Sequence, residues 1–274
     1  MIRAAVLGSD VSKSRSPAIH NAAFRAMGVD GQYGAISVEP QKFDALVGDL
    51  RAQGYRYLNV TIPHKAAAFA IAGAHGPEAR VSGAVNTLLF EPGGAIRGEN
   101  TDGAGLLAAL GDLGVTASGA TVVMAGAGGA AAGAVEALTR TGAQVRLLAR
   151  RAEIADQLRA RLEPAQRDRV TVMPWTGDGL VRALAGATVL VSAVPAVAWA
   201  DASTASGIET LAGAAVLEMA YGGETPLAVA ARARGAAYAD GLGMLVHQAA
   251  HAIALALGKP PPLAPLFEAA RSSP

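Results

Sequence analysis

The sequence predicts an α/β protein of two domains with a cleft between them. Short apolar runs alternate with stretches that carry apolar residues at helical spacing, a pattern typical of mostly parallel sheets covered by helices. The 274 residues are enough for two domains of ordinary size. Apolar residues make up 51% of the chain and aromatic residues only 4%, with 33 glycines. This mixture favours helices packed closely on sheets over a β-sandwich.

The first hundred residues contain three predicted strands and three predicted helices. The runs at 4–7, 33–38 and 57–61 are bounded by turn residues, as strands are. Residues 17–27 and 41–53 have apolar side chains at helical spacing, and another helix is expected to begin near His64. Ser16 and Pro17 fit a helix N-cap followed by a first-turn proline.

A second alternating series begins near Thr121. Residues 121–125 form a predicted strand, and a glycine-rich turn connects it to a helix that runs through Thr139. Further strands are expected at 144–148, 170–173, 188–193 and 215–219. A connecting helix at 102–114 separates the two series, so the domain boundary is expected near it.

Charge and cysteine content exclude several classes of protein. The net charge is +1 and no long run of one sign occurs, so neither nucleic acid nor a membrane surface is an expected partner. The absence of cysteine excludes disulfides, a thiolate nucleophile and cysteine-ligated zinc. The first residues do not resemble a signal peptide, so the cytoplasm is the expected location. His247 and His251 lie four residues apart without a third ligand, so no metal site is predicted.

A glycine-rich turn follows the predicted strand at 121–125. Residues 126–131 read GAGGAA and match G-x-G-x-x-G/A between a strand and a helix. In such a site the first glycine permits the turn, the second admits a pyrophosphate, and the small last residue lets helix and strand pack. A tight turn without a ligand is the alternative, but the flanking elements favour a dinucleotide site. The residues expected to touch the dinucleotide are Gly126, Ala127, Gly128, Gly129 and Ala130.

The end of the next predicted strand indicates which dinucleotide binds. NAD sites usually place an acidic residue there to hold the ribose 2′-hydroxyl. This chain has Arg150 and Arg151 instead, with no acid before Glu153. Guanidinium groups suit a 2′-phosphate because they bind phosphate oxygens in pairs. NADP is therefore the predicted cofactor, with a solvated basic turn as the alternative.

Lysine is rare in this chain, which draws attention to Lys65. Most of the 23 basic residues are arginine, and among basic side chains lysine is the one that can exchange a proton near neutral pH. Lys65 lies just after a predicted strand, at the end of a sheet where α/β proteins bind ligands. Asp102 precedes the second domain, and a carboxylate beside Lys65 would orient its ammonium group. From the residues alone, a solvated surface charge is the commoner interpretation of each.

Several motifs together resemble the shikimate dehydrogenase family. They are residues 12–17 (SKSRSP), 59–65 (NVTIPHK), 83–87 (GAVNT), 100–102 (NTD), the glycine turn, 225–227 (TPL) and 241–248 (GLGMLVHQ). Their order and joint presence cover nearly the whole chain. The resemblance implies NADP-dependent, reversible reduction of 3-dehydroshikimate to shikimate, a step of chorismate and aromatic amino acid biosynthesis. It also implies a substrate-binding domain of residues 1–103 joined by C-terminal helices at 242–274, and a Rossmann-like NADP-binding domain of residues 104–241.

The resemblance assigns roles to particular residues. Lys65 and Asp102 match the catalytic pair, in which Lys65 donates or stabilises the proton that arrives on the carbonyl oxygen. Ser14 and Ser16 correspond to the hydroxyl pair that receives the substrate carboxylate, and in an extended segment both would lie on one face. Other residues implied to contact the substrate are Asn59, Thr61, Asn86, Tyr221 and Gln248, and further residues implied to contact the cofactor are Met219 and Gly241.

Two departures from the family pattern lie in the second domain. The usual Asn-Arg-Thr/Ser segment is Ala149, Arg150 and Arg151 here, which keeps only the arginine. The usual Asn-x-x-Pro-x-Gly segment is residues 192–197 (SAVPAV), and its changes are expected to reshape the nicotinamide side of the site.

Two alternative functions stay open at this point. Quinate dehydrogenases, including dual quinate/shikimate enzymes, share the scaffold, often use NAD, and commonly differ at the second hydroxyl of the carboxylate-binding pair. Ser16, with Arg150 and Arg151, favours shikimate and NADP. A non-catalytic metabolite sensor is the other alternative, and retention of Lys65 and Asp102 argues against it. The expected partner is a small-molecule substrate, and the chain is expected to act as a monomer or homodimer.

Overall fold

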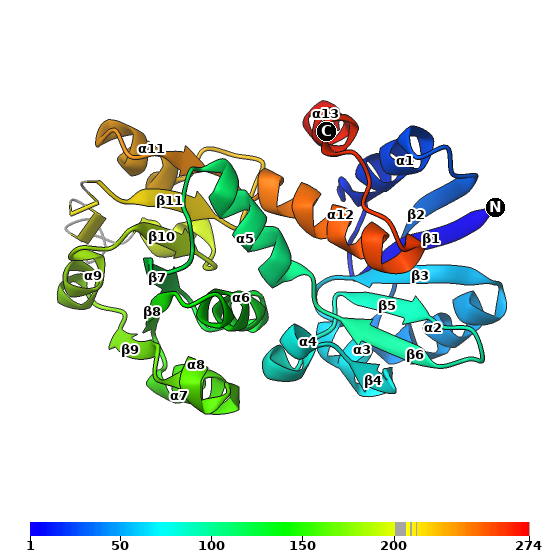
Figure 1. The fold of residues 1–274 in the computed structure, drawn as a ribbon, viewed down its shortest axis with the longest axis horizontal. Coiled ribbons are helices and arrows are strands. Elements are labelled where there is room, and N and C mark those ends of the chain that lie inside the picture. Colours follow the sequence, from blue (N-terminus) through cyan, green and yellow to red (C-terminus); the bar gives the residue numbers. More distant parts are fainter. Residues whose placement is uncertain (201–206, 209, 212, 274) are drawn as a thin grey trace. The chain divides into compact units, whose positions relative to one another are not determined.

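The chain divides into two compact units, each built around a six-stranded sheet. The computed structural model describes residues 1–200, 207–208, 210–211 and 213–273. One unit comprises Met1–Gly105 and Leu245–Pro274, and the other comprises Leu106–Met244. The boundaries between the two units fall within two helices, α5 (Asp102–Asp112) and α12 (Leu242–Leu257), labelled in Figure 1. In the described part of the chain, no helix has the length and apolar character needed to cross a membrane. The cleft expected between the domains stays a prediction.

The sheet of the first unit has parallel and antiparallel parts, in the order β2-β1-β3-β5-β6-β4. Its parallel strands β1 (Ile2–Gly8), β2 (Gly31–Ser37) and β3 (Tyr55–Val60) lie where the sequence predicts them. The hairpin of β5 (Thr87–Phe90) and β6 (Ile96–Glu99) pairs antiparallel with β3, and β4 (Ala74–His75) closes the edge. The prediction missed this hairpin, because its strands are only four residues long.

Helices cover both faces of this sheet. Alternate residues of β1 point to opposite faces, so Ala5 and Leu7 join one core cluster while Ala4 and Val6 join another. The first cluster packs beneath α2 (Phe43–Ala52) and α3 (Lys65–Ile71). The second includes Phe24 of α1 (Ser16–Ala26) and a residue of α12, so the C-terminal segment belongs to this core. The remaining helical elements of the unit are η1 (Pro40–Lys42), α4 (Pro77–Ser82) and α13 (Leu263–Ser272).

The sheet of the second unit is parallel throughout, in the order β12-β11-β10-β7-β8-β9. Its strands are β7 (Thr121–Ala125), β8 (Gln144–Ala149), β9 (Val170–Pro174), β10 (Val189–Ser192), β11 (Ala215–Glu218) and β12 (Tyr238–Ala239). The central strands are buried on both faces, which explains their continuous apolar character. Read from β9, this is the strand order of a Rossmann fold, and its topological switch point lies between β7 and β10.

The helices of this unit follow the strands in alternation. They are α6 (Gly129–Arg140), α7 (Ala152–Arg161), α8 (Pro164–Arg167), α9 (Gly177–Leu184), η2 (Ala196–Trp199) and α11 (Pro226–Ala233). Helix α6 begins directly after the glycine turn, as the sequence predicts, and the backbone of the first turn carries no side-chain cap. The carboxyl ends of β7 and β10 are joined where the N–H of Ala193 donates to the carbonyl of Ala125 at 2.9 Å.

Two glycines of the first unit should respond to alanine with opposite signs. A Cβ on Gly98 in β6 would lie 2.6 Å from a methyl carbon of the buried Val85, so Gly98→Ala should lower the free energy of unfolding by about 1–3 kcal/mol. Gly48, in the middle of α2, is exposed with no protein atom within 4 Å of its Cβ position. Gly48→Ala should therefore raise the free energy of unfolding by roughly 0.5–1 kcal/mol. Urea unfolding of both variants measures the difference, and a shift in the same direction for both would contradict this account of the packing.

Candidate active site

Lys65 and Asp102 meet in the first unit. The Lys65 ammonium lies 2.7 Å from Oδ2 of Asp102, and the carboxylate side chain is only 6% exposed. Each begins a helix: Lys65 is the first residue of α3, and Asp102 is the first of α5. The backbone N–H of Asp102 donates to the side-chain oxygen of Asn100 at 3.0 Å, which fixes the start of α5. The contact expected from the sequence is therefore present, and the chemical roles of the two residues stay predictions.

The side-chain amide of Asn86 holds Asp102 on its other side. Asn86 Nδ2 donates to Asp102 Oδ1 at 2.9 Å and to Oε1 of Gln248 at 3.2 Å. The orientation of this amide is fixed because its oxygen accepts the backbone N–H of Thr101 at 3.0 Å. Gln248 accepts through its oxygen, which leaves its NH₂ group to donate to a ligand. One asparagine thus orients both the carboxylate of the pair and a predicted substrate-binding amide.

Asn59 is joined to the same network through the strand pair β3–β5. Asn59 Nδ2 donates to the hydroxyl of Thr87 at 2.9 Å, and that hydroxyl donates to Asn86 Oδ1 at 3.0 Å. The oxygen of Asn59 accepts from the hydroxyl of Tyr33 at 2.7 Å. Burial raises the pKa of Tyr33 well above its usual range, so the phenol stays protonated and donates. Sequence reasoning identified the asparagines but missed Tyr33 and Thr87.

His20 lies beneath this network and was not expected from the sequence. Its ring stacks on Tyr33 with centroids 3.9 Å apart, and its Nδ1 lies 2.7 Å from the hydroxyl of Tyr57. His20 is 1% exposed, and desolvation lowers its pKa to about 3. The imidazole is therefore neutral at ordinary pH. His20 lies four residues after Ser16, on the same face of α1, and this spacing could have indicated that it lies near the predicted site.

Ser14 and Ser16 are adjacent in space, but not in the way the sequence suggested. Arg15, not Ser16, occupies the N-cap position, with φ −79° and ψ −8°. The segment therefore turns, and the expectation of an extended segment is wrong. The turn has a local cause, because the hydroxyl of Ser14 accepts the N–H of Ser16 at 3.3 Å. Both side chains are half-buried; Ser14 lies in the connection between β1 and α1, and Ser16 is the first residue of α1.

Thr61 lies at the carboxyl end of β3. Its N–H donates to the carbonyl of Leu7 in β1 at 2.8 Å, which places it beside the end of that strand. Its methyl group packs against Gly8, where a Cβ would come within 2.6 Å. The predicted substrate residues of the first unit thus come from the start of α1 and the residues before it, from the end of β3, from the segment before β5 and from α12.

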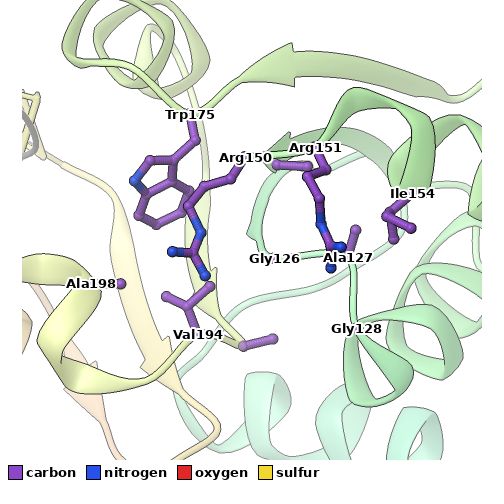
Figure 2. A pocket seen from close by; sticks show the side chains of 11 residues that line it. Gly126, Ala127, Gly128, Arg150, Arg151, Ile154, Trp175, Val194 and Ala198 are labelled. Carbon is purple, nitrogen blue, oxygen red and sulfur yellow. The ribbon is translucent and has the colours of Figure 1, made fainter.

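A pocket lies at the carboxyl edge of the sheet in the second unit (Figure 2). Gly126 is in the left-handed region with φ +105°, and a Cβ there would lie 3.0 Å from the Val194 side chain. At Gly128 no protein atom lies within 4 Å of the Cβ position, so this side of the turn is open to a ligand. Ala131 is fully buried against the sheet. The lining residues are Gly126, Ala127, Gly128, Ala149, Arg150, Arg151, Ile154, Trp175, Ala193, Val194 and Ala198.

The pocket has the features of a phosphate site. The first N–H groups of α6 lack partners within the helix, and the helix dipole favours an anion at this end. Arg150 and Arg151 extend their guanidinium groups along the pocket from the end of β8 (Figure 2). Neither forms an ion pair with a carboxylate in the described part of the chain. The residues present therefore fit a dinucleotide with an added 2′-phosphate.

The segment that departs from the family pattern has its own packing. Ser192 replaces the usual asparagine, and its hydroxyl accepts the indole N–H of Trp199 at 2.9 Å. Both residues are buried. Val197, in place of the usual glycine, is 77% exposed. The serine thus anchors a tryptophan behind the pocket, a contact that sequence reasoning did not foresee.

Met219 and Gly241 are held together in the second unit. A Cβ on Gly241 would collide with the carbonyl oxygen of Met219, and the N–H of Gly241 donates to the carbonyl of Ala220 at 2.9 Å. The glycine is thus required for close approach to the backbone that carries Met219. Tyr221, two residues later, is 39% exposed.

Helix α12 carries the two histidines that lie four residues apart, His247 and His251. His247 makes an edge-on contact with the ring of Phe267, with centroids 5.4 Å apart. Among the described residues, no three side chains of the types that bind metals lie close enough to share an ion.

These features define a class: an oxidoreductase scaffold with a Rossmann unit for a dinucleotide and a second α/β unit that carries a lysine–carboxylate pair. Residues 6–88 match the family model of the shikimate dehydrogenase substrate binding domain. An NADP(+)-dependent shikimate dehydrogenase from Anaeromyxobacter sp. is 40% identical over 98% of this chain and 95% of its own length. The chain belongs to the shikimate dehydrogenase family.

Solved structures agree with this family over the whole fold. Shikimate 5-dehydrogenase from Thermus thermophilus, solved in complex with NADP(H) and shikimate, is 30% identical, with a TM-score of 0.84 and full coverage of both chains. An Ael1 enzyme from Pseudomonas putida is 32% identical, with a TM-score of 0.87 over 98% of this chain and 97% of its own.

The buried His20 should make stability depend on pH. Its pKa is about 3 in the folded chain and near 6.5 when unfolded, so the unfolded state binds one more proton between these values. The neutral imidazole of His20 therefore contributes fully to stability above about pH 6.5, and this contribution is lost as the pH falls toward 3. Between pH 7 and pH 5, the free energy of unfolding measured in urea should fall by about 2 kcal/mol more in wild type than in His20→Gln.

Tyr57→Phe provides the control for this prediction. It removes the hydroxyl partner of His20 but keeps the imidazole buried, so the steeper pH dependence should persist. Equal pH dependence in wild type and His20→Gln would show that His20 is not buried in its neutral form.

Proposed function

We propose that this protein is an NADP-dependent shikimate dehydrogenase, which reversibly reduces 3-dehydroshikimate to shikimate. The observation that carries the proposal is the Lys65–Asp102 contact at 2.7 Å. Asn86 donates hydrogen bonds to both Asp102 and Gln248 and so connects this pair to Gln248. The relatives named as NADP(+)-dependent shikimate dehydrogenases match almost the entire chain, and this supports the same activity here.

The first unit supplies the acid–base groups of the reaction. When bound, NADPH supplies the hydride for the ketone carbon. Lys65 donates a proton to the carbonyl oxygen or stabilises the negative charge that develops on it. Asp102 keeps the ammonium oriented, and although its two oxygens already accept from Lys65 and Asn86, each retains a lone pair for a substrate hydroxyl. Ser14 and Ser16 are proposed to receive the substrate carboxylate, and Asn59, Thr61, Asn86, Tyr221 and Gln248 its remaining oxygens.

The second unit is proposed to bind the cofactor. The glycine turn and the N-terminus of α6 receive the pyrophosphate, since this end of a helix presents free N–H groups. Arg150 and Arg151 receive the 2′-phosphate, which accounts for NADP over NAD. Met219 and the backbone held by Gly241 are proposed to lie at the nicotinamide end. The remaining residues proposed to contact the cofactor do so through the backbone of the turn and the start of α6, and they are Ala127, Gly129 and Ala130.

A quinate-oxidising enzyme is the second candidate function. Quinate differs from shikimate at the ring carbon that carries the carboxylate, so the serine pair bears on the choice. Ser16, next to the N-cap of α1, keeps the second hydroxyl and favours shikimate. We further propose that the protein acts in the cytoplasm on this small molecule, as a monomer or homodimer, without nucleic acid or membrane partners.

The function is tested by initial rates of nicotinamide reduction with shikimate or quinate, each crossed against NADP and NAD. The proposal expects the highest kcat/KM for shikimate with NADP. A preference for quinate or NAD would keep the family and change the substrate or cofactor assignment. Folded protein that binds shikimate but reduces no cofactor in any combination would make it a sensor.

Lys65→Ala should lower kcat by about 10²–10⁴-fold, the usual contribution of a positioned acid–base group. Binding of NADP should change little, because Lys65 lies in the first unit and the dinucleotide pocket in the second. Stopped-flow rates and calorimetric Kd values measure the two effects separately.

Lys42→Ala is the matched control. Its ammonium pairs only on the surface, 2.9 Å from a Glu39 that is itself largely exposed, so kcat should equal that of wild type. Near-normal turnover in Lys65→Ala would refute the proposed role of Lys65.

A further inference from the structure

Trp175 forms one wall of the dinucleotide pocket and has no assigned role. It follows β9 directly, and its backbone N–H donates to the backbone carbonyl of Ala149 at 3.1 Å. This bond places the indole beside Arg150, at the end of the pocket away from the glycine turn (Figure 2). The indole is half-buried, so part of its ring faces the pocket.

The indole of Trp175 is held in place from behind. Its ring lies 5.1 Å from that of Trp199, at an interplanar angle of 55°. Trp199 is 2% exposed and is fixed in turn by its hydrogen bond to Ser192. Trp175 also packs on the core cluster of the second unit. A ring supported in this way presents a rigid, preformed surface.

Apart from the two arginines, the side chains that line the pocket with Trp175 are apolar. The side chains flanking Arg150 are Ala149 and Arg151 rather than an asparagine and a hydroxyl residue. Val194 and Ala198 line the pocket with Trp175. Apart from the guanidinium groups, this part of the pocket therefore offers a ligand few hydrogen-bonding side chains and a large aromatic face.

We propose that Trp175 is the residue on which the adenine ring of the cofactor stacks. The inference rests on the proposed function and adds a residue that determines cofactor affinity. A purine has a flat π-face that stacks on an indole without any hydrogen-bond pattern. Arg150 and Arg151 hold the neighbouring phosphate, so the adenosine end is bound by charge on one side and by stacking on the other.

The test uses 2′,5′-ADP, which carries the adenine and the 2′-phosphate but no nicotinamide. Trp175→Ala should raise the Kd of this fragment and of NADP about ten-fold, and Trp175→Phe, which keeps a ring, should restore most of the affinity. Ribose 2,5-bisphosphate, which lacks the adenine, should bind all three proteins alike. Calorimetry supplies the Kd values, and shikimate binding serves as the check on folding.

Fluorescence provides an independent readout, because the chain has only two tryptophans. In Trp199→Phe, Trp175 is the only indole, and saturating 2′,5′-ADP should quench its emission. In Trp175→Phe, the buried Trp199 should be quenched little, although the fragment still binds.

The outcomes separate this inference from the proposed function. If wild type binds 2′,5′-ADP but Trp175→Ala binds it equally well, or if Trp175 is not quenched, Trp175 only fills the core and the inference is wrong. If wild type binds neither NADP nor 2′,5′-ADP, the NADP-dependent function itself is wrong. If the ten-fold loss appears for ribose 2,5-bisphosphate as well, the substitution has disturbed the phosphate site, and stacking is refuted.

Discussion

The side-chain amide of Asn86 is the point on which the first unit's site depends. Its oxygen accepts the backbone N–H of Thr101 just before α5, so its NH₂ group faces Asp102, Gln248 and the hydroxyl of Thr101. Through Asp102 it reaches the Lys65 ammonium, and through Thr87 it reaches Asn59. Buried polar networks of this kind are stable only when every member is satisfied. The geometry of the site is therefore a property of the whole network, set by strands β3 and β5 and two helices.

The two units have related α/β architecture but present different kinds of group at their candidate sites. The pocket of the second unit presents backbone groups, at the N-terminus of α6 and at a turn in which Gly126 has a positive φ, beside the side chains of Arg150 and Arg151. The first unit uses side chains, each held by a neighbour. Backbone sites tolerate changes in the surrounding side chains, which is consistent with the loss of the usual residues at 149, 151 and 192. In the first unit each side chain depends on a hydrogen-bonded neighbour, so the loss of one displaces the others.

Local patterns were sufficient to predict much of this structure. Strand β7 begins and ends where its apolar run does, and the turn and helix after it follow the glycine motif. The pairing of Lys65 with Asp102 was implied by the family motifs, in which the two residues match the catalytic pair, and the contact is present. The Tyr33–Asn59–Thr87 chain was not, since it depends on Asn59 lying opposite Thr87 in an antiparallel ladder. Register between strands distant in sequence cannot be read from one chain. Trp175 was missed for a similar reason, because its neighbour Trp199 comes from another strand's loop.

The first sheet is completed from both ends of the sequence. Ala256 of α12 packs in the same cluster as Ala4 and Val6 of β1, and Arg15 donates to the carbonyl of Ala270 in α13 at 3.2 Å. During synthesis, the strands of this unit emerge first but lack these partners until the last helices have left the ribosome. The Rossmann unit, whose residues form one continuous segment, has no such delay. The unit that carries Lys65 and Asp102 is thus begun before the Rossmann unit and completed after it, and its apolar face must be protected from aggregation in the interval.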